Sequence, residues 1–188
     1  MIQLLRTAHD VQILCQEQNW RFCFIGGIAS LRWGEPRVTQ DVDLTLLTRF
    51  GDEEKFIDIL LKHFIPRLNN AAQFALTRRV LLIQSSTGIG IDIALGGLPF
   101  EESAVRRSSN CIFEKSISLR TCSAEDLIVF KAFADRPRDW IDVEGILIRQ
   151  ADLLDWKYIK KQLQELVKLK EAPEIMSRLE QLRQNCQS

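Results

Sequence analysis

The chain has 188 residues, of which 46% are hydrophobic, and its 25 basic side chains are balanced by 25 acidic ones. This length and composition predict either one compact domain or a core with a small helical extension. The charge balance excludes a global electrostatic field that would attract a nucleic acid or a membrane, but it is compatible with a small local basic patch.

Cysteine and histidine usage excludes several further classes of site. The five cysteines are an odd number without a CxxC spacing, which argues against a disulfide framework and against a thiolate zinc site. His9 and His63 lie far apart, which argues against a histidine-rich metal site and against Ser-His-Asp catalysis. Neither a signal peptide nor an apolar run long enough to cross a bilayer is visible. We therefore expect a cytoplasmic protein with reduced thiols and no membrane partner.

The hydrophobic periodicity of the first 120 residues alternates between helical and strand spacing. In chain order the expected elements are a helix over 2–18, a strand over 21–25, two helical turns over 28–33, a strand over 42–46, a helix over 53–64, strands over 80–83 and 89–95, and one or two weaker strands over 111–119. The strands over 80–83 and 89–95 are separated by a Ser-Ser-Thr-Gly turn and are expected to form a hairpin.

After residue 120 the pattern becomes helical. Ser123 begins a capping-box sequence, a second helix is expected after Pro137, and Pro173 separates two further amphipathic helices. The sequence thus predicts an α/β (α+β) fold with a small mixed sheet of about four to five strands and flanking helices. We expect residues 1–120 to form the core and residues 121–188 to form a C-terminal helical region packed on it.

Asp41 and Asp43 alternate with Val42 and Leu44 in the strand expected over 42–46. Residues two apart in a strand point to the same face, so the two carboxylates lie about 6–7 Å apart along the strand and repel each other without a cation. Hard divalent cations such as Mg²⁺ prefer such oxygen ligands together with substrate phosphates. Taken alone, the pattern is more typical of a solvated sheet edge than of a metal site.

Asp92 is the polar exception in an apolar strand, Ile89-Gly90-Ile91-Asp92-Ile93-Ala94. The isoleucines face one way, and Asp92 faces the other way with two small residues. A lone carboxylate in such a strand is costly unless it has a partner. If this strand lies beside the Asp43 strand, three carboxylates converge, which is the arrangement that two-metal phosphoryl transfer requires.

Gly26-Gly27 lies where the first strand is expected to turn into a helix. Glycines at such a turn let backbone amides approach phosphate oxygens, and the helix N-terminus adds favourable partial charge. Ser30, on the first helical turn, is placed to donate as well. The alternative is a plain turn with no ligand.

Together these residues resemble a known signature. Gly26-Gly27-x-x-Ser30, followed by Arg37-Val38-Thr39-Gln40-Asp41-Val42-Asp43-Leu44, resembles the signature of the DNA polymerase beta-type nucleotidyltransferase superfamily. The Arg-x-Thr-x-Asp-x-Asp-Leu form is similar to the AbiEii-like abortive-infection nucleotidyltransferases, many of which are toxins of toxin–antitoxin pairs.

The resemblance assigns roles to these positions. It implies that Asp41 and Asp43 bind magnesium and that Asp92 completes the triad. It also implies that Gly26, Gly27 and Ser30 contact nucleotide phosphates. A toxin of such a pair would have an antitoxin protein as a partner.

Lys131 interrupts a helix that is apolar on nearly every side. A buried lysine needs an anionic partner or loses its proton, and a triphosphate would be such a partner, as it is for a similar lysine in the family. Alternatively, the stem packs while the ammonium reaches water. Asp139 and Asp142, three residues apart on the next helix, and the nearby Arg138 are expected to orient Lys131 or an arginine, or else to form an ordinary surface ion-pair cluster.

We expect a magnesium-dependent nucleotidyltransferase that uses two Mg²⁺ ions and transfers a nucleoside monophosphate from an NTP to an acceptor hydroxyl. Asp41, Asp43 and Asp92 are its expected catalytic and metal-binding residues. Lys131 is expected to help to bind the triphosphate. Arg37 is expected to contact the nucleotide and to stabilise the segment that leads into the strand. Thr39 is expected to support these residues without contacting the nucleotide. The acceptor is open between RNA or tRNA, a protein and a small molecule.

Two other functions remain open from the sequence. One is a non-catalytic module of the same fold that acts through a protein or RNA partner. The other is a nuclease with the same acids, which accounts less well for Gly26-Gly27 because hydrolysis of a backbone phosphate requires no triphosphate site. Arg106-Arg107 is expected to be a solvated face, or else a contact for an RNA backbone.

Overall fold

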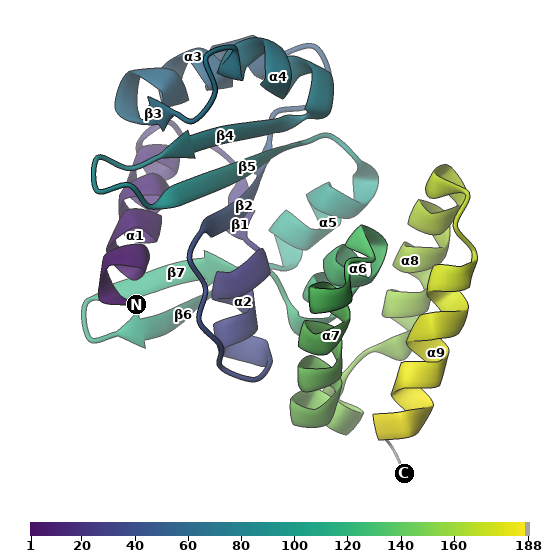
Figure 1. The fold of residues 1–188 in the computed structure, drawn as a ribbon. Helices are drawn as coiled ribbons and strands as arrows, with labels where there is room; N and C mark the ends of the chain where they lie inside the picture. Colours follow the sequence, from purple (N-terminus) through teal and green to yellow (C-terminus); the bar gives the residue numbers. More distant parts are fainter. Residues whose placement is uncertain (187–188) are drawn as a thin grey trace. The chain divides into compact units, whose positions relative to one another are not determined.

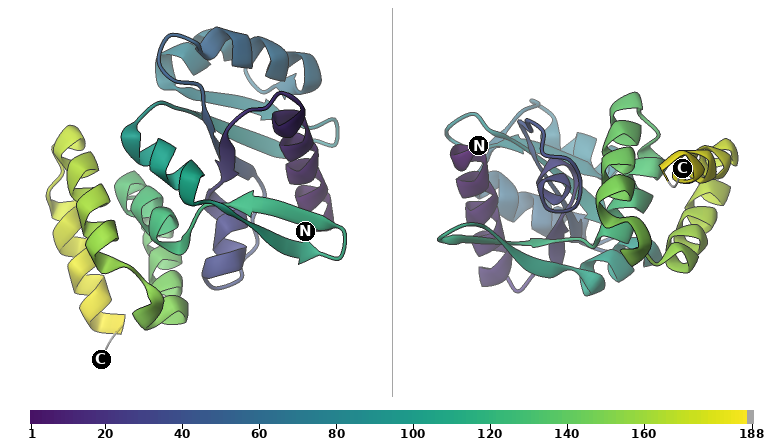
Figure 2. Two further views of the ribbon diagram at one scale, coloured as in Figure 1. Left: turned by 180° about the vertical axis from the view of Figure 1, so that it is seen from behind. Right: turned by 90° about the horizontal axis from the view of Figure 1, so that it is seen from below.

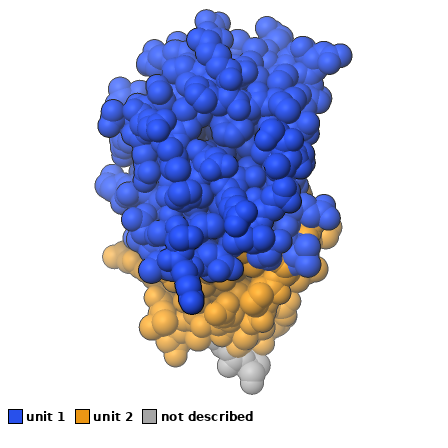
Figure 3. Space-filling model, turned by 90° about the vertical axis from the view of Figure 1, so that its left-hand side faces the viewer, with its two compact units in different colours: residues 1–28, 38–122 blue, residues 29–37, 123–188 orange. Residues whose placement is uncertain are grey.

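The computed structural model describes residues 1–186 and divides the chain into two compact units (Figure 3). Unit 1 comprises residues 1–28 and 38–122. Unit 2 comprises residues 29–37 and the described part of 123–188. Helix α2 (Gly26–Trp33) begins in unit 1 and ends in unit 2. Residues 29–37 thus belong to the helical unit, although they lie early in the sequence.

Unit 1 is a mixed sheet with helices (Figure 1). Its strands are β1 (Phe22–Phe24), β2 (Val42–Leu47), β3 (Ile65–Pro66), β4 (Val80–Gln84), β5 (Gly90–Gly96), β6 (Ser109–Glu114) and β7 (Ile117–Thr121). Besides the start of α2, its helices are α1 (Ile2–Glu17), α3 (Glu53–His63), α4 (Ala71–Arg78) and α5 (Pro99–Arg107).

Within the described residues the strands form one 7-stranded sheet in the order β3-β4-β5-β2-β1-β7-β6. The mixed α/β class is confirmed, but the expected size of four to five strands was too small. The sheet is larger because the 111–119 region forms a complete hairpin, β6–β7, whose strand β7 pairs with β1, and because the very short β3 adds to the other edge. The expected β4–β5 hairpin is present.

The central strands are held by one apolar core. Val42, Leu44 and Leu46 are fully buried on one face of β2, and they belong to a cluster with residues of α1, α3 and α4. α3 and α4 pack against each other at the β3–β4 edge (Figure 1), and α1 lies beside the β6–β7 hairpin (Figure 2). The buried alternate residues of β2 fix which residues of the strand face the other way.

Unit 2 is helical. Besides the end of α2, it contains α6 (Ala124–Ala134), α7 (Pro137–Gln150), η1 (Ala151–Leu153), α8 (Trp156–Lys170) and α9 (Glu174–Cys186). The expected cap of α6 is present, since the Ser123 hydroxyl accepts the backbone N–H of Asp126 at 3.2 Å. The buried Asp126 carboxylate also accepts the hydroxyl of Tyr158 at 2.6 Å, which ties α8 to α6.

No helix in residues 1–186 is both long and apolar enough to cross a bilayer.

Candidate active site

Asp41 and Asp43 lie at the beginning of β2, on the face opposite to its buried apolar side chains. Val42 and Leu44 are fully buried, whereas Asp43 is half-buried and Asp41 is exposed. The alternation that the sequence predicts therefore orients both carboxylates to one face of the strand.

The neighbouring strand brings Asp92 to the same face. β5 runs parallel to β2, and in their register Asp43 lies directly opposite Asp92. Adjacent strands are about 4.8 Å apart, so these two carboxylates are close neighbours. Continuing the register, Asp41 faces Gly90, and a Cβ at Gly90 would collide with Oδ1 of Asp41. The three acids thus share one face of two paired strands.

Arg67 is part of this carboxylate face and was missed from the sequence. It follows β3, and its guanidinium donates to Oδ1 of Asp92 in a close ion pair. A Cβ at Gly90 would lie 3.1 Å from Nη1 of Arg67, so the guanidinium extends over Gly90 as well. No local pattern indicates this role, because Arg67 stands alone in a segment with no predicted element.

Within residues 1–186 no three histidine, cysteine, aspartate or glutamate side chains are arranged to hold a metal ion as they stand. In this structure the guanidinium of Arg67 is the counter-charge beside the Asp92 carboxylate.

Gly26 and Gly27 form the start of α2 beside Asp43. Gly26 has a φ of +52°, in the left-handed region that favours glycine, and a Cβ there would collide with the Asp43 carboxylate. The backbone N–H of Gly27 donates to Oδ2 of Asp43 at 3.3 Å. The glycine pair therefore lets the helix N-terminus approach the carboxylate closely.

The side chain of Thr39 explains why a glycine is needed at position 27. A Cβ at Gly27 would collide with Oγ1 of Thr39, and the same hydroxyl donates to the backbone carbonyl of Asp41 at 3.4 Å. Thr39 thus lies between the start of α2 and the turn into β2. The indirect role expected for it stays a prediction.

The other predicted residues lie in unit 2, where Lys131 is the centre of a buried ion network. Its side chain is only 5% exposed, and its ammonium donates to Asp142 at 2.5 Å and to Asp139 at 3.3 Å. Both carboxylates are buried as well. Lys131 therefore has its anionic partners within the protein, in Asp139 and Asp142.

Two arginines complete the network. Arg37 donates to both carboxylate oxygens of Asp142, at 2.5 and 2.7 Å, and Arg136 donates to Asp139 at 2.5 Å. Burial alone would raise the pKa of Asp142, but the hydrogen bonds and charges of Arg37 and Lys131 outweigh it and hold that pKa below its ordinary value. The network joins three cations to two carboxylates.

Ser30 is buried on α2, and Arg138 is exposed on α7. Both have further interactions within the described residues. They lie in unit 2 with Lys131 and Arg37.

Comparison with solved structures defines the class of the fold. The chain resembles an antigenic nucleotidyltransferase-like protein from Paracoccidioides brasiliensis, with 14% identity, a TM-score of 0.52, and coverage of 95% of this chain and 93% of that one. It also resembles the antibiotic-resistance factor ANT(2'')-Ia in solution, with 17% identity, a TM-score of 0.51, and coverage of 94% and 95%. A third similar structure is the lincomycin-bound lincosamide antibiotic adenylyltransferase LnuA, with 13% identity, a TM-score of 0.50, and coverage of 72% of this chain and 91% of that one. The fold is therefore that of a nucleotidyltransferase.

The family follows from the sequence match. Residues 12–182 match the model of the nucleotidyl transferase AbiEii toxin family of type IV toxin–antitoxin systems, so the chain belongs to that family. No curated protein matches the chain significantly. The protein is a nucleotidyltransferase, an enzyme that transfers nucleoside monophosphates.

The ion network around Asp142 predicts how the free energy of unfolding changes at acid pH. Because the pKa of Asp142 in the folded chain lies below the unfolded value of about 3.9, the unfolded state takes up its proton first as the pH falls. The carboxylate therefore stabilises the fold above about pH 4, and this contribution is lost as the pH falls through the folded-state pKa. We expect Asp142→Asn to lower the free energy of unfolding by about 3 kcal/mol near neutral pH, because Lys131 and Arg37 lose a charged partner.

The measurement is urea denaturation of wild type and variant between about pH 7 and pH 3. The difference in unfolding free energy should shrink at the acid end. Asp58→Asn, at an exposed position on α3, is the matched control. A difference that stays constant down to the lowest pH would contradict the role of the Asp142 charge.

Proposed function

We propose that this nucleotidyltransferase uses magnesium to transfer a nucleoside monophosphate from an NTP to an acceptor hydroxyl, with release of pyrophosphate. Asp41, Asp43 and Asp92 are the proposed catalytic carboxylates. The observation that carries the proposal is the β2–β5 register, in which Asp43 faces Asp92 and Asp41 lies on the same face over Gly90.

The donor set on this face suits the ion. Carboxylate oxygens are hard ligands of the kind that Mg²⁺ prefers, and Mg²⁺ is usually bound by one or two carboxylates together with waters and substrate phosphates. A preformed cage of three acids is therefore not required before the NTP binds. We propose that the Arg67 guanidinium moves away from Asp92 when the cation binds, because the cation then balances the negative charge of the Asp92 carboxylate.

Bound in this place, two Mg²⁺ ions would supply the charge that stabilises the attacking and leaving oxygens. Asp41 and Asp43 would hold the ions, and Asp92 would bind one of them or accept the proton of the attacking hydroxyl. The amides at Gly26 and Gly27 begin a helix whose N-terminus favours phosphate. Ser30, Arg37 and Lys131 stay predicted nucleotide contacts.

We also propose that the enzyme acts as a toxin whose partner is an antitoxin protein. The family to which the chain belongs supports this proposal. A small antitoxin-like gene next to the gene for this chain would support it further. RNA, including tRNA, is the acceptor that we would test first, followed by proteins and small molecules.

The activity test is incubation of the purified chain with α-labelled NTPs, magnesium and bulk RNA or protein. We expect wild type to transfer label, and Asp41→Asn, Asp43→Asn and Asp92→Asn each to lower the rate by at least about 100-fold, since each removes charge that holds the ions. Asp58→Asn, outside the carboxylate face, should transfer label like wild type. Equal label transfer by wild type and Asp41→Asn would refute the mechanism.

Arg67 offers a test that does not depend on the acceptor. Without its guanidinium, the carboxylates of β2 and β5 repel one another more strongly in EDTA, and a cation should relieve more of that repulsion. We therefore expect Arg67→Gln to have a lower Tm than wild type in EDTA and to gain more Tm on addition of Mg²⁺. The measurement is thermal unfolding with and without Mg²⁺.

Arg79→Gln is the matched control. Arg79 forms a similarly close ion pair with Glu53, on α3 and away from the three aspartates. This variant should lose stability without a larger response to Mg²⁺. An equal Mg²⁺-dependent gain in both variants would mean that Arg67 and the cation do not compete for Asp92.

A further inference from the structure

Unit 1 has a basic pocket at the end of the sheet where β1 begins. Its volume is about 410 Å³, and three of its lining residues are arginines that are far apart in the sequence. Arg21 directly precedes β1, Arg106 lies in the last turn of α5, and Arg120 lies in β7. We call this the arginine pocket.

The arginine pocket is separate from the three aspartates. The backbone carbonyl of Arg21 accepts the N–H of Leu47, at the C-terminal end of β2, whereas Asp43 lies near the beginning of that strand. Asp43 and Leu47 are four residue steps apart along the strand, which is about 13 Å. A ligand in the arginine pocket thus does not occupy the place proposed for the magnesium ions.

The positive charge of the pocket is not neutralised by the protein. Among residues 1–186, Arg21, Arg106 and Arg120 form no ion pair with a carboxylate, and no acidic residue lines the pocket. By contrast, Arg67 has a close acidic partner in Asp92, and Arg79 has one in Glu53. Like charges around one cavity repel one another, so an anion in it would be favourable.

Two of the guanidinium groups are held in place by neutral hydroxyls. Arg106 donates to the Ser103 hydroxyl at 3.2 Å, and Nε of Arg120 donates to the Ser108 hydroxyl at 2.7 Å. Ser108 is itself fixed, because its hydroxyl donates to the carbonyl of Val105 at 2.6 Å. Both serines are buried. These contacts orient the arginines without removing their charge, which lowers the cost of ordering them around a ligand.

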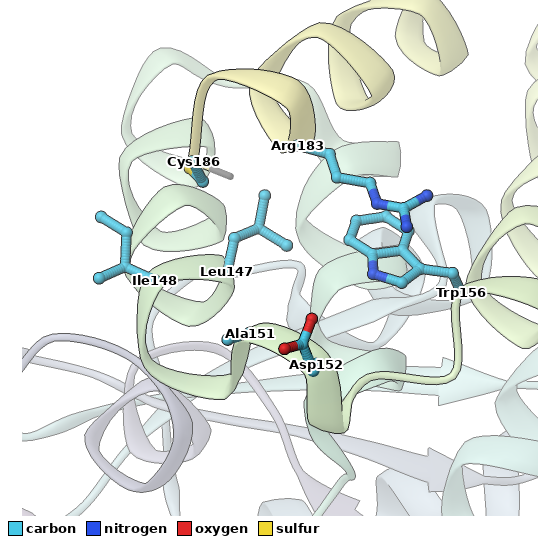
Figure 4. A pocket seen from close by; sticks show the side chains of 7 residues that line it. All are labelled: Leu147, Ile148, Ala151, Asp152, Trp156, Arg183 and Cys186. Atoms are coloured by element: carbon cyan, nitrogen blue, oxygen red, sulfur yellow. The ribbon is translucent and has the colours of Figure 1, made fainter. Parts of the chain in front are cut away.

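A pocket in unit 2 shows the contrast (Figure 4). It has a volume of about 360 Å³, and Arg183 lies over the ring of Trp156 in it at 4.1 Å. There, however, Asp152 lines the cavity and Glu180 lies 4.0 Å from Arg183, so the positive charge has acidic neighbours. Of the two, the arginine pocket has the stronger preference for an anion.

We propose that the arginine pocket binds the phosphate group of a nucleotide or polynucleotide. Arginine matches phosphate geometry with paired N–H donors, which makes phosphate the anion best suited to a three-arginine site. Trp20, Gln16 and Asn110 also line the pocket and add an aromatic ring and two amides, the groups that contact bases. The ligand is either a polynucleotide backbone or a free nucleotide, and the site does not depend on nucleotidyl transfer.

The test is binding to the full chain in EDTA, so that failure of the magnesium proposal cannot affect it. The probes are a fluorescein-labelled single-stranded RNA of mixed sequence, read by fluorescence anisotropy, and labelled ATP. Whichever of the two probes the wild type binds, we expect R21Q/R106Q/R120Q to bind it at least about tenfold more weakly. For RNA, the slope of log affinity against log salt concentration should also fall by about 2 for three lost phosphate contacts.

R6Q/K62Q/R78Q is the matched control, since it removes the same charge from exposed positions of unit 1 outside the pocket. It should bind like wild type. If the chain binds the labelled RNA and neither ATP nor inorganic phosphate competes, the ligand of the pocket is a polynucleotide backbone. If ATP displaces the bound RNA, the ligand is a free nucleotide. Equal losses in both triple variants, or no binding of either probe by wild type, would overturn the proposal. If the triple variant fails to fold by circular dichroism, Arg21→Gln alone replaces it, because the Arg21 side chain has no partner to lose within residues 1–186.

Discussion

Mutual repulsion between the carboxylates on one face of β2 and β5 is the constraint that the neighbouring residues of unit 1 have to meet. The register that pairs Asp43 with Asp92 also brings Asp41 over Gly90, so the face concentrates negative charge. The protein offsets this charge with an amide at the N-terminus of α2 and with the guanidinium of Arg67. Glycines at 26 and 90 leave the space that the carboxylates occupy. In the proposed mechanism, a divalent cation adds further positive charge to this face.

Unit 2 also has two neighbouring carboxylates, and there they form ion pairs with basic side chains. Asp139 and Asp142 are buried, and burial of a charge is tolerated only with partners that hydrogen-bond to it. Lys131, Arg37 and Arg136 provide those partners, and Arg37 comes from the short segment that belongs to this unit although it lies early in the chain. Arg37 therefore fastens residues 29–37 to α7 through a paired hydrogen bond with Asp142.

Features that depend on local periodicity could be predicted from the sequence. The alternation in β2, the polar exception in the isoleucine-rich β5 and the Ser123 cap of α6 all lie within a few residues of chain, and the structure contains each of them. The mixed α/β class followed from the same patterns. The number of strands did not, because β3 has only two residues and the β1–β7 pairing joins distant segments.

The exact partners of Asp92 and Arg37 could not be predicted for a similar reason. Arg67 reaches Asp92 across 25 residues, and Arg37 reaches Asp142 across 105. Such ion pairs are set by tertiary packing and leave no local pattern. The three arginines of the arginine pocket are likewise brought together from the start of β1, the end of α5 and β7.

The central claim is that Asp41, Asp43 and Asp92 form the metal site for the NTP. A measurement of divalent-cation binding tests this claim most directly. Mn²⁺ serves as the probe, and its free concentration is followed by electron paramagnetic resonance during titration in the presence of a non-hydrolysable NTP analogue. Wild type should bind about two ions per chain, as two-metal phosphoryl transfer requires. Asp43→Asn should bind Mn²⁺ much more weakly. Unchanged stoichiometry and affinity in Asp43→Asn would contradict the claim.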